Sequence, residues 1–239
     1  MNYHPHLVDW DRERVSRFWA WHRGYPPVQE NLFSWQCGPA IYRKARRLGI
    51  DFSGKILDFG CGSGDLIAQL RQRGIDARGI EFAPQAKAAA EARFGQDIGA
   101  CVTEAKDLPT SFEDASFDAV FLIEVIEHLL DEDLGPTLGE IRRLLRPGGR
   151  VMITTPNREP IDCHLTHCPD CGCTFHPVQH VRAFSPDTMR KLLTEHGLRP
   201  IHVLETCLPT RTLGSRLTSL AYAVVGATPP HLVAVATAA

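Results

Sequence analysis

The chain has 239 residues, with 26 Lys and Arg against 28 Asp and Glu, and its net charge is −2 with neutral histidine. This length suits one large domain, or a domain with a small insert. The balanced charge argues against a surface built wholly to hold nucleic acid. The chain starts without a signal-like segment and has no apolar run that could span a bilayer, so we expect a cytoplasmic protein without a membrane segment. Its eight cysteines then indicate metal binding or burial rather than disulfides.

The first part of the chain is rich in aromatic and basic residues. Val15, Phe18 and Trp19 share one face of a predicted helix, and Ile41–Leu48 has the pattern of a second amphipathic helix. We therefore expect a helical cap over residues 1–52 that packs on the core. A second interpretation is that this cap also covers a ligand, because aromatic side chains often line the mouth of a binding site.

The segment Lys55–Gly64, with the sequence KILDFGCGSG, predicts a buried strand that runs into a tight turn. Gly60 and Gly62 permit backbone angles and a close ligand approach that a side chain would prevent. The segment Asp65–Arg73 then predicts a helix that Gly74 ends. The turn therefore brings backbone amides and a helix N-terminus towards a polar ligand.

Strand and helix patterns alternate along the rest of the chain. Further strands are predicted at Ala77–Phe82, Gly99–Thr103, Phe117–Ile123, Arg150–Thr155, Ile201–Glu205 and His231–Thr237, and helices at Pro84–Phe94, Leu134–Leu145, 185–197 and Leu213–Val225. Repeated strand–helix units predict an α/β fold, with a seven-stranded, mostly parallel, Rossmann-like sheet covered by helices on both faces. Residues 53–239 would form this domain, interrupted by a Cys- and His-rich insert at 156–184.

Two acidic residues indicate which nucleotide-like ligand the turn binds. Glu81 ends the second strand, about 20 residues after the glycine turn, where such folds place a carboxylate against ribose hydroxyls. Asp58 precedes the glycines, where a carboxylate would repel a phosphate but pair with a cationic amino group or a sulfonium. The pattern therefore favours S-adenosylmethionine over a dinucleotide.

Five motifs in order resemble those of the Rossmann-like S-adenosylmethionine-dependent methyltransferases. They are ILDFGCGSG, Glu81, TEAKDLP, SFDAVFLIEVIEHL and LLRPGGRVMITTPN, and they cover roughly residues 54–155. The resemblance implies that Asp58 and the turn backbone meet the amino-acid part of the cofactor, and that Glu81 binds the ribose. It places Glu104 and the Ala105 amide at the adenine edge. The full implied cofactor set is Asp58, Gly60, Cys61, Gly62, Glu81, Phe82, Glu104, Ala105 and Glu124.

The segment Glu124–His128 follows the fourth strand, at the edge of the sheet where ligands bind. Its spacing puts Glu124, Glu127 and His128 on one side of a helical turn. In one interpretation His128 is a general base, with Glu124 beside it, as in similar motifs of ubiquinone-type O-methyltransferases. In another, these three residues and His180 hold a divalent metal, which resembles the small-RNA 3′-end 2′-O-methyltransferases. In a third, the turn is only structural.

The insert contains the run DCHLTHCPDCGCTFHPVQH. The spacing of Cys168, Cys171, His176 and His180 is typical of a zinc knuckle, and thiolates with imidazoles suit tetrahedral Zn²⁺. Further candidates for the fourth ligand are Cys163, His164, His167 and Cys173. A loop this short has no core of its own, so a structural zinc ion would supply its folding energy.

The sequence thus predicts a methyltransferase that transfers a methyl group from S-adenosylmethionine to a small-molecule acceptor, most readily an oxygen. Two alternatives remain open. One is a metal-dependent RNA 2′-O-methyltransferase, which the neutral overall charge disfavours. The other is a protein that binds the cofactor or a partner without turnover, against which the intact Asp58, glycine turn and Glu81 argue.

Overall fold

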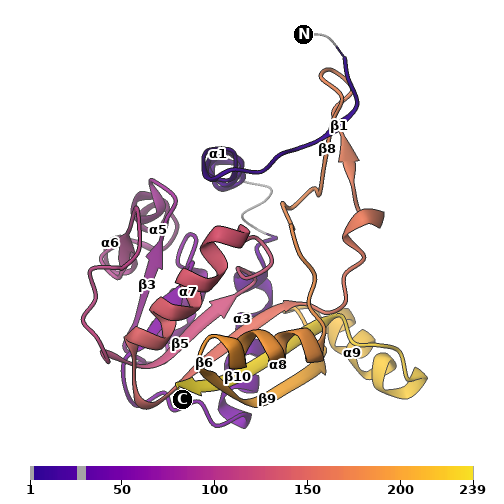
Figure 1. Cartoon of the computed structure of the whole chain (residues 1–239). Helices are drawn as coiled ribbons and strands as arrows, with labels where there is room; N and C mark the ends of the chain where they lie inside the picture. The colour runs from indigo at the N-terminus through magenta and orange to yellow at the C-terminus, as the bar shows by residue number, and fades with distance from the viewer. Residues whose placement is uncertain (1–2, 26–30, 239) are drawn as a thin grey trace.

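The computed structural model describes residues 3–25 and 31–238, and its centre is a seven-stranded sheet (Figure 1). The strand order is β4–β3–β2–β5–β6–β10–β9. The strands are β2 (Ile56–Phe59), β3 (Ala77–Glu81), β4 (Val102–Glu104), β5 (Phe117–Ile123), β6 (Leu145–Pro156), β9 (Leu198–Thr206) and β10 (His231–Ala238). The first five strands pair in parallel, and β10 runs antiparallel to both of its neighbours. The predicted seven-stranded, mostly parallel sheet is confirmed.

Helices cover both faces of this sheet because successive residues of each buried strand point to opposite faces. In β5, Phe121 packs into the core on one face and Leu122 into the core on the other. The first face is covered by α3 (Phe33–Arg47), α4 (Asp65–Arg71) and α5 (Ala86–Phe94), and the second by α7 (Asp131–Leu144) and α8 (Pro186–Glu195). A last helix, α9 (Leu213–Val225), precedes β10.

One predicted strand is wrong. The segment Gly99–Thr103 divides into a short helix, α6 (Gln96–Gly99), and the strand β4, which starts three residues later than expected. Gly95 has a φ of 91°, and the amides of Ile98 and Gly99 donate back to its carbonyl oxygen, which closes the helical turn. The apolar pattern alone did not distinguish this turn from an extended segment.

In the described part of the predicted cap, the helices α1 and α3 have different roles. α3 belongs to the core, since Cys37, Ile41 and Ala45 are buried beneath the sheet. α1 (Arg12–Gly24) instead contacts the start of α7 through an ion pair from Arg12 to Asp133. α1 therefore lies beside the start of α7, whereas α3 packs against the sheet.

The insert is an extended arm rather than a loop folded against the sheet (Figure 1). It contains a 3-10 turn, η1 (Ile161–Cys163), and a hairpin of β7 (Thr166–His167) and β8 (Cys173–Phe175). The N-terminal strand β1 (His6–Leu7) pairs in parallel with β8 and completes a small three-stranded sheet. Within the described ranges, no helix has the length and apolar character needed to cross a membrane.

Candidate functional site

Four acidic residues lie at the carboxyl ends of four neighbouring strands. Asp58 is in β2, Glu81 and Glu104 end β3 and β4, and Glu124 follows β5. Glu81 and Glu104 are directly paired in the register of their strands. Because the carboxyl ends of parallel strands meet at one edge of a sheet, these four acidic residues lie on the same side of the molecule.

Asp58 is the most deeply buried of the cofactor candidates, with 2% of its surface exposed. Burial raises the pKa of its carboxyl to about 8, and the nearby carboxylates of Glu81 and Asp65 add to the increase. A cationic group bound beside Asp58 would reverse this effect, because it favours the ionised carboxylate. The site therefore has an acid whose charge is stabilised only when a positive ligand is present.

The glycine turn is held against β3 by its own amides. The amides of Gly60 and Cys61 both donate to the Ile80 carbonyl oxygen, at 2.8 and 3.0 Å. Gly60 has a φ of 79°, and a Cβ there would lie 2.7 Å from Cγ2 of Val125. Both facts explain why the chain needs glycine at this position. The buried side chain of Cys61 lies beneath the turn in the same core as α4.

Glu81 closes the turn from the other side. Its carboxylate accepts hydrogen bonds from the amides of Gly62 at 2.9 Å, Phe82 at 2.8 Å and Ala83 at 3.0 Å. The carboxylate is therefore fixed between the turn and the start of the following loop. This geometry suits a residue that presents its oxygens to a ribose at a defined place.

Glu104 and the Ala105 amide already make hydrogen bonds within the protein. Glu104 accepts a hydrogen bond from the Lys87 amide at 3.0 Å, in the first turn of α5. The Ala105 amide donates to the Glu81 carbonyl oxygen at 2.9 Å, within the sheet. An amide that donates inside the sheet is not available to an adenine, so the implied Ala105 contact has no donor.

Glu124 has a strained backbone, with a φ of 50°. Residues in this region cost energy and are commonly found at functional sites. Its carboxylate accepts a hydrogen bond from the Thr154 hydroxyl at 2.7 Å. Burial raises the pKa of Glu124 to about 7, although the Thr154 hydrogen bond opposes the increase. Near neutral pH this group can therefore both take up and release a proton.

Glu127, His128 and His180 come together beside Glu124, and ligand atoms of the three lie within 4.8 Å of one another. Glu127 is 1% exposed, and neither carboxylate oxygen accepts a well-aligned hydrogen bond from the described residues. Burial, followed by the charge of Glu124, raises its pKa well above the ordinary value. Burial and the charge of His180 lower the pKa of His128 to about 3, so its ring is neutral.

The tautomer of His128 follows from its partner. Nδ1 of His128 lies 3.3 Å from the Gln179 carbonyl oxygen, so it carries the proton of the neutral ring and leaves the lone pair on Nε2, 3.9 Å from Oε1 of Glu127. Nδ1 of His180 contacts the Glu159 carboxylate, and Nε2 of His180 lies 4.0 Å from the same oxygen of Glu127. Two such imidazoles and a carboxylate can serve as a base with its neighbours or as ligands of a divalent metal.

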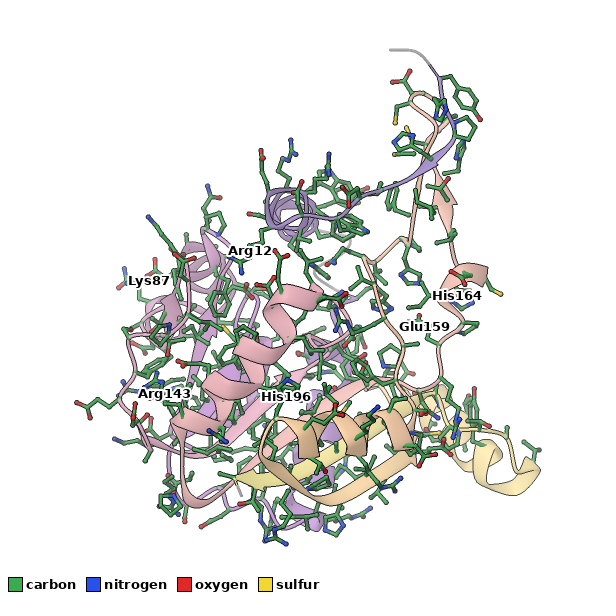
Figure 2. The ribbon with its side chains drawn as sticks, viewed as in Figure 1. Arg12, Lys87, Arg143, Glu159, His164 and His196 are labelled. Atoms are coloured by element: carbon green, nitrogen blue, oxygen red, sulfur yellow. The ribbon has the colours of Figure 1, made fainter. Side chains whose placement is uncertain are left out.

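The predicted zinc knuckle of Cys168, Cys171, His176 and His180 does not form as one group. Cys168 and Cys171 lie with Cys173, whereas His176 lies with Glu159 and His164, and His180 lies with Glu127 and His128. The hairpin is the reason: the cysteines lie on its turn, and both histidines follow β8 on the return towards the sheet. Figure 2 labels Glu159 and His164 in this inner part of the arm.

Three important residues were missed in the sequence. Gln179 is fully buried, accepts a hydrogen bond from Nε1 of Trp19 at 2.9 Å, and donates to the His128 carbonyl oxygen at 3.0 Å. Glu159 orients His180. Trp19 was predicted as a residue of the aromatic cap, which either packs on the core or also covers a ligand, but its edge-on contact with the His128 ring at 4.8 Å was not foreseen. Long-range contacts of this kind leave no local pattern, so spacing could not have found them.

Comparison with known proteins identifies relatives over much of the chain. The profile of the family described as "Methyltransferase domain" matches residues 36–203. The O-methyltransferase resE of Aspergillus sclerotiorum is 32% identical over 173 residues, which is 67% of this chain and 62% of that protein. The O-methyltransferase cnsE of Penicillium expansum is 34% identical over 181 residues, covering 68% and 60%. The chain thus spans about three fifths of the length of these curated relatives.

A solved structure has the same fold. It is a Burkholderia thailandensis 1,6-didemethyltoxoflavin N1-methyltransferase with its acceptor and S-adenosylhomocysteine, at a TM-score of 0.63 and 18% identity, covering 98% of this chain and 93% of that one. The family match covers well over half of the chain. The chain belongs to the methyltransferase-domain family.

Proposed function

We propose that the protein binds S-adenosylmethionine at the edge formed by β2, β3 and the glycine turn. The observation that carries this proposal is the buried carboxyl of Asp58, which lies in β2 directly before the glycine turn that hydrogen-bonds to the end of β3. Glu81, fixed by three amides, would receive the ribose hydroxyls. Phe82 and Glu104 lie next along the same edge, and Glu124 borders it on the side of the acceptor.

Calorimetry with S-adenosylmethionine and S-adenosylhomocysteine tests this site. We expect the wild type to bind both compounds and Asp58→Ala to lose most of the affinity for them. Asp76→Asn is a matched control, because Asp76 lies on the surface and pairs with Arg71. An Asp58→Ala variant that keeps full affinity would refute the assignment.

We infer that the reaction is methyl transfer to a small molecule, with oxygen as the favoured acceptor atom. Two curated relatives are named O-methyltransferases, which supports this class of acceptor. S-Adenosylmethionine would supply an activated methyl group by in-line displacement, so the main tasks of the protein are to align the acceptor and exclude water. A hydroxyl acceptor must in addition lose a proton.

His128 is the proposed base for that proton. Its ring is neutral and its Nε2 is unprotonated, so it can accept a proton from a hydroxyl placed beside it. Stabilisation of the imidazolium that forms requires Glu127, whose Oε1 lies 3.9 Å from Nε2 of His128, to be ionised at that step. Trp19 lies against the same ring and would help to exclude water.

Turnover of a panel of phenols and other hydroxyl compounds tests the base. We expect His128→Gln to lower kcat by about 10²- to 10⁴-fold, the usual contribution of a general base, with unchanged cofactor affinity. His202→Gln, on β9, is the control substitution. If His128→Gln keeps wild-type kcat on every accepted substrate, the residue is not the base.

A second candidate function is a metal-dependent methyl transfer. The observation that favours it is the buried carboxylate of Glu127, neither oxygen of which accepts a well-aligned hydrogen bond from the described residues. The ligands would be Glu127, His128 and His180, and Glu159 would orient His180. Glu124 lies close enough for its charge to raise the pKa of Glu127. The metal would replace the proton on Glu127 and polarise a bound hydroxyl. A 2′-hydroxyl of RNA is one such acceptor.

Dependence on a divalent ion separates the two candidates. If His128 is the base, activity survives chelation. If His128 is a ligand, activity is lost on chelation and returns with added Mg²⁺, Mn²⁺ or Co²⁺, and Glu127→Gln and His180→Gln behave alike. Filter binding to short RNA at two salt concentrations then tests RNA as the acceptor.

We further propose that residues 1–52 and 53–239 act as cap and methyltransferase domain, with the arm at 156–184 as a substrate-shaping insert. A zinc ion in this arm would have a structural role, because cysteines on the hairpin lie apart from the acidic edge (Figure 1).

A further inference from the structure

Three thiols gather on the hairpin of the insert, outside the candidate methyl-transfer site. The Sγ atoms of Cys168, Cys171 and Cys173 all lie within 4.8 Å of one another. Each residue is partly exposed, and all three are free thiols. Three soft ligands at this separation match a zinc site better than any other common metal site.

The backbone of the turn brings the three sulfurs together. The Cys168 amide donates to the Cys173 carbonyl oxygen at 2.8 Å, and the Gly172 amide donates to the Cys168 carbonyl oxygen at 3.0 Å. Gly172 has a φ of 82°, which reverses the chain after the second cysteine. The amides of Cys171 and Asp170 donate to the Cys168 sulfur.

The N-terminal strand β1 lies against this turn and brings a histidine. The His6 amide donates to the Gly172 carbonyl oxygen at 3.1 Å, and the parallel register pairs His6 with Cys173. Paired residues of neighbouring strands project to the same face, so His6 shares the face of Cys173. Nδ1 of His6 lies 2.7 Å from the His4 carbonyl oxygen. Its Nε2 is then the free donor atom, as in most zinc-bound histidines.

We propose that the hairpin and the N-terminal strand together bind one structural Zn²⁺, through the thiolates of Cys168, Cys171 and Cys173 and through Nε2 of His6. Binding replaces the three thiol protons, which pass to solvent, and leaves the neutral imidazole as the fourth ligand. The three sulfurs already lie together, whereas His6 lies outside this group and its side chain would turn towards them when the ion binds. Four ligands would then complete a tetrahedral site without a place for substrate. This site is distinct from the Glu127 group, and it goes beyond the methyl-transfer reaction.

The ion would fasten the start of the chain to the insert. Val8, directly after β1, donates to the Thr174 carbonyl oxygen, and Trp10 meets Phe175 edge-on with ring centroids 6.2 Å apart. From there the chain enters α1, where Trp19 contacts His128. A metal at the hairpin would therefore hold the cap over the acceptor side of the active site.

Metal analysis of the full-length wild type tests the thiol site. We expect about one zinc equivalent that resists dialysis and is lost from the Cys168→Ser/Cys171→Ser/Cys173→Ser variant. Cobalt substitution should give a thiolate-to-metal charge-transfer band in the wild type and in His128→Ala, and none in the triple variant. A disulfide among these cysteines, or a cobalt spectrum without that band, would overturn the proposal.

His6→Ala tests the fourth ligand, with His4→Ala, two residues earlier in the chain, as its matched control. We expect His6→Ala to bind zinc more weakly in competition with a chromophoric chelator, to alter the cobalt ligand-field bands, and to increase hydrogen exchange of the Val8 amide. His4→Ala should match the wild type. Identical behaviour of all three proteins would remove His6 from the site.

Calorimetry with S-adenosylhomocysteine keeps this proposal separable from the methyltransferase proposal. Every variant should bind that compound with wild-type affinity, which also shows that the variants are folded. A triple-cysteine variant that loses zinc and also loses cofactor binding would contradict a role confined to the cap.

Discussion

At the scale of single residues, the site depends on carboxyl groups that the fold keeps protonated. Glu124 is an example, since burial raises its pKa to about 7 while the Thr154 hydroxyl holds the increase in check. The strained φ of Glu124 directs its side chain to this one partner. A substitution at Thr154 should therefore shift the pKa of Glu124.

Thr154→Val tests this balance. The substitution keeps the buried shape but removes the donor to Glu124, so the pKa of Glu124 should rise further. If ionised Glu124 supports turnover, the acidic limb of the pH–rate profile moves to higher pH by about one unit, the usual worth of a hydrogen bond to a charged group. Thr237→Val, also buried and hydrogen-bonded to Gly149, is the control and should leave the profile unchanged. An unshifted profile in Thr154→Val would mean that Glu124 does not titrate in the reaction.

At the scale of elements, α1 reaches the active site through one hydrogen bond and one ring contact. Trp19 donates to Gln179, which itself donates to the His128 carbonyl oxygen. The segment after the insert is also tied to the same turn, because the Val181 amide donates to the Glu127 carbonyl oxygen at 3.0 Å. Cap, insert and active-site turn are therefore coupled through Gln179.

Trp19→Phe should loosen this coupling. It removes one donor and leaves an aromatic ring, so we expect the KM for the acceptor to rise about 2- to 10-fold, as the loss of a single hydrogen bond allows. The affinity for S-adenosylmethionine should not change. Trp21→Phe is the control, because Trp21 is 60% exposed on the same helix. Equal effects of the two substitutions would show that α1 acts only through general packing.

Elements with a strong local pattern could be predicted from the sequence, and those set by distant contacts could not. The bounds of β5 and α9 agree with the predicted ones because a continuous apolar strand and an amphipathic helix carry their own signal. The positions of Asp58 and Glu81 could be predicted because a residue at a strand end is placed by that strand alone. The four residues of the predicted zinc knuckle instead divide among three groups, because cysteine and histidine spacing does not say where a hairpin turns.

At the scale of the whole molecule, the buried acids connect stability to pH. The pKa of Asp58 rises from an ordinary value of 3.8 to about 8, and that of Glu124 from 4.5 to about 7. Between these ordinary values and the raised ones, the folded protein holds protons that the unfolded chain has released. Below pH 6.5 the lowered pKa of His128 acts in the opposite direction. Stability of the cofactor-free protein should therefore fall as pH rises from about 6.5 to 8, by on the order of a few kcal/mol.

Thermal unfolding across this pH range tests the link, with Asp58→Asn as the decisive variant. The substitution removes the titrating carboxyl, so the melting temperature should decline less steeply with pH than in the wild type and lie above it at pH 8. Asp76→Asn, at an exposed ion pair, should follow the wild type. S-Adenosylmethionine should stabilise the wild type more at pH 8 than at pH 6, because a bound cation then meets an Asp58 that ionises at little cost. It should stabilise Asp58→Asn at neither pH. A wild-type melting temperature that stays level or rises from pH 6.5 to 8 would contradict the raised pKa of the buried acids, and with it the physical basis of the cofactor site.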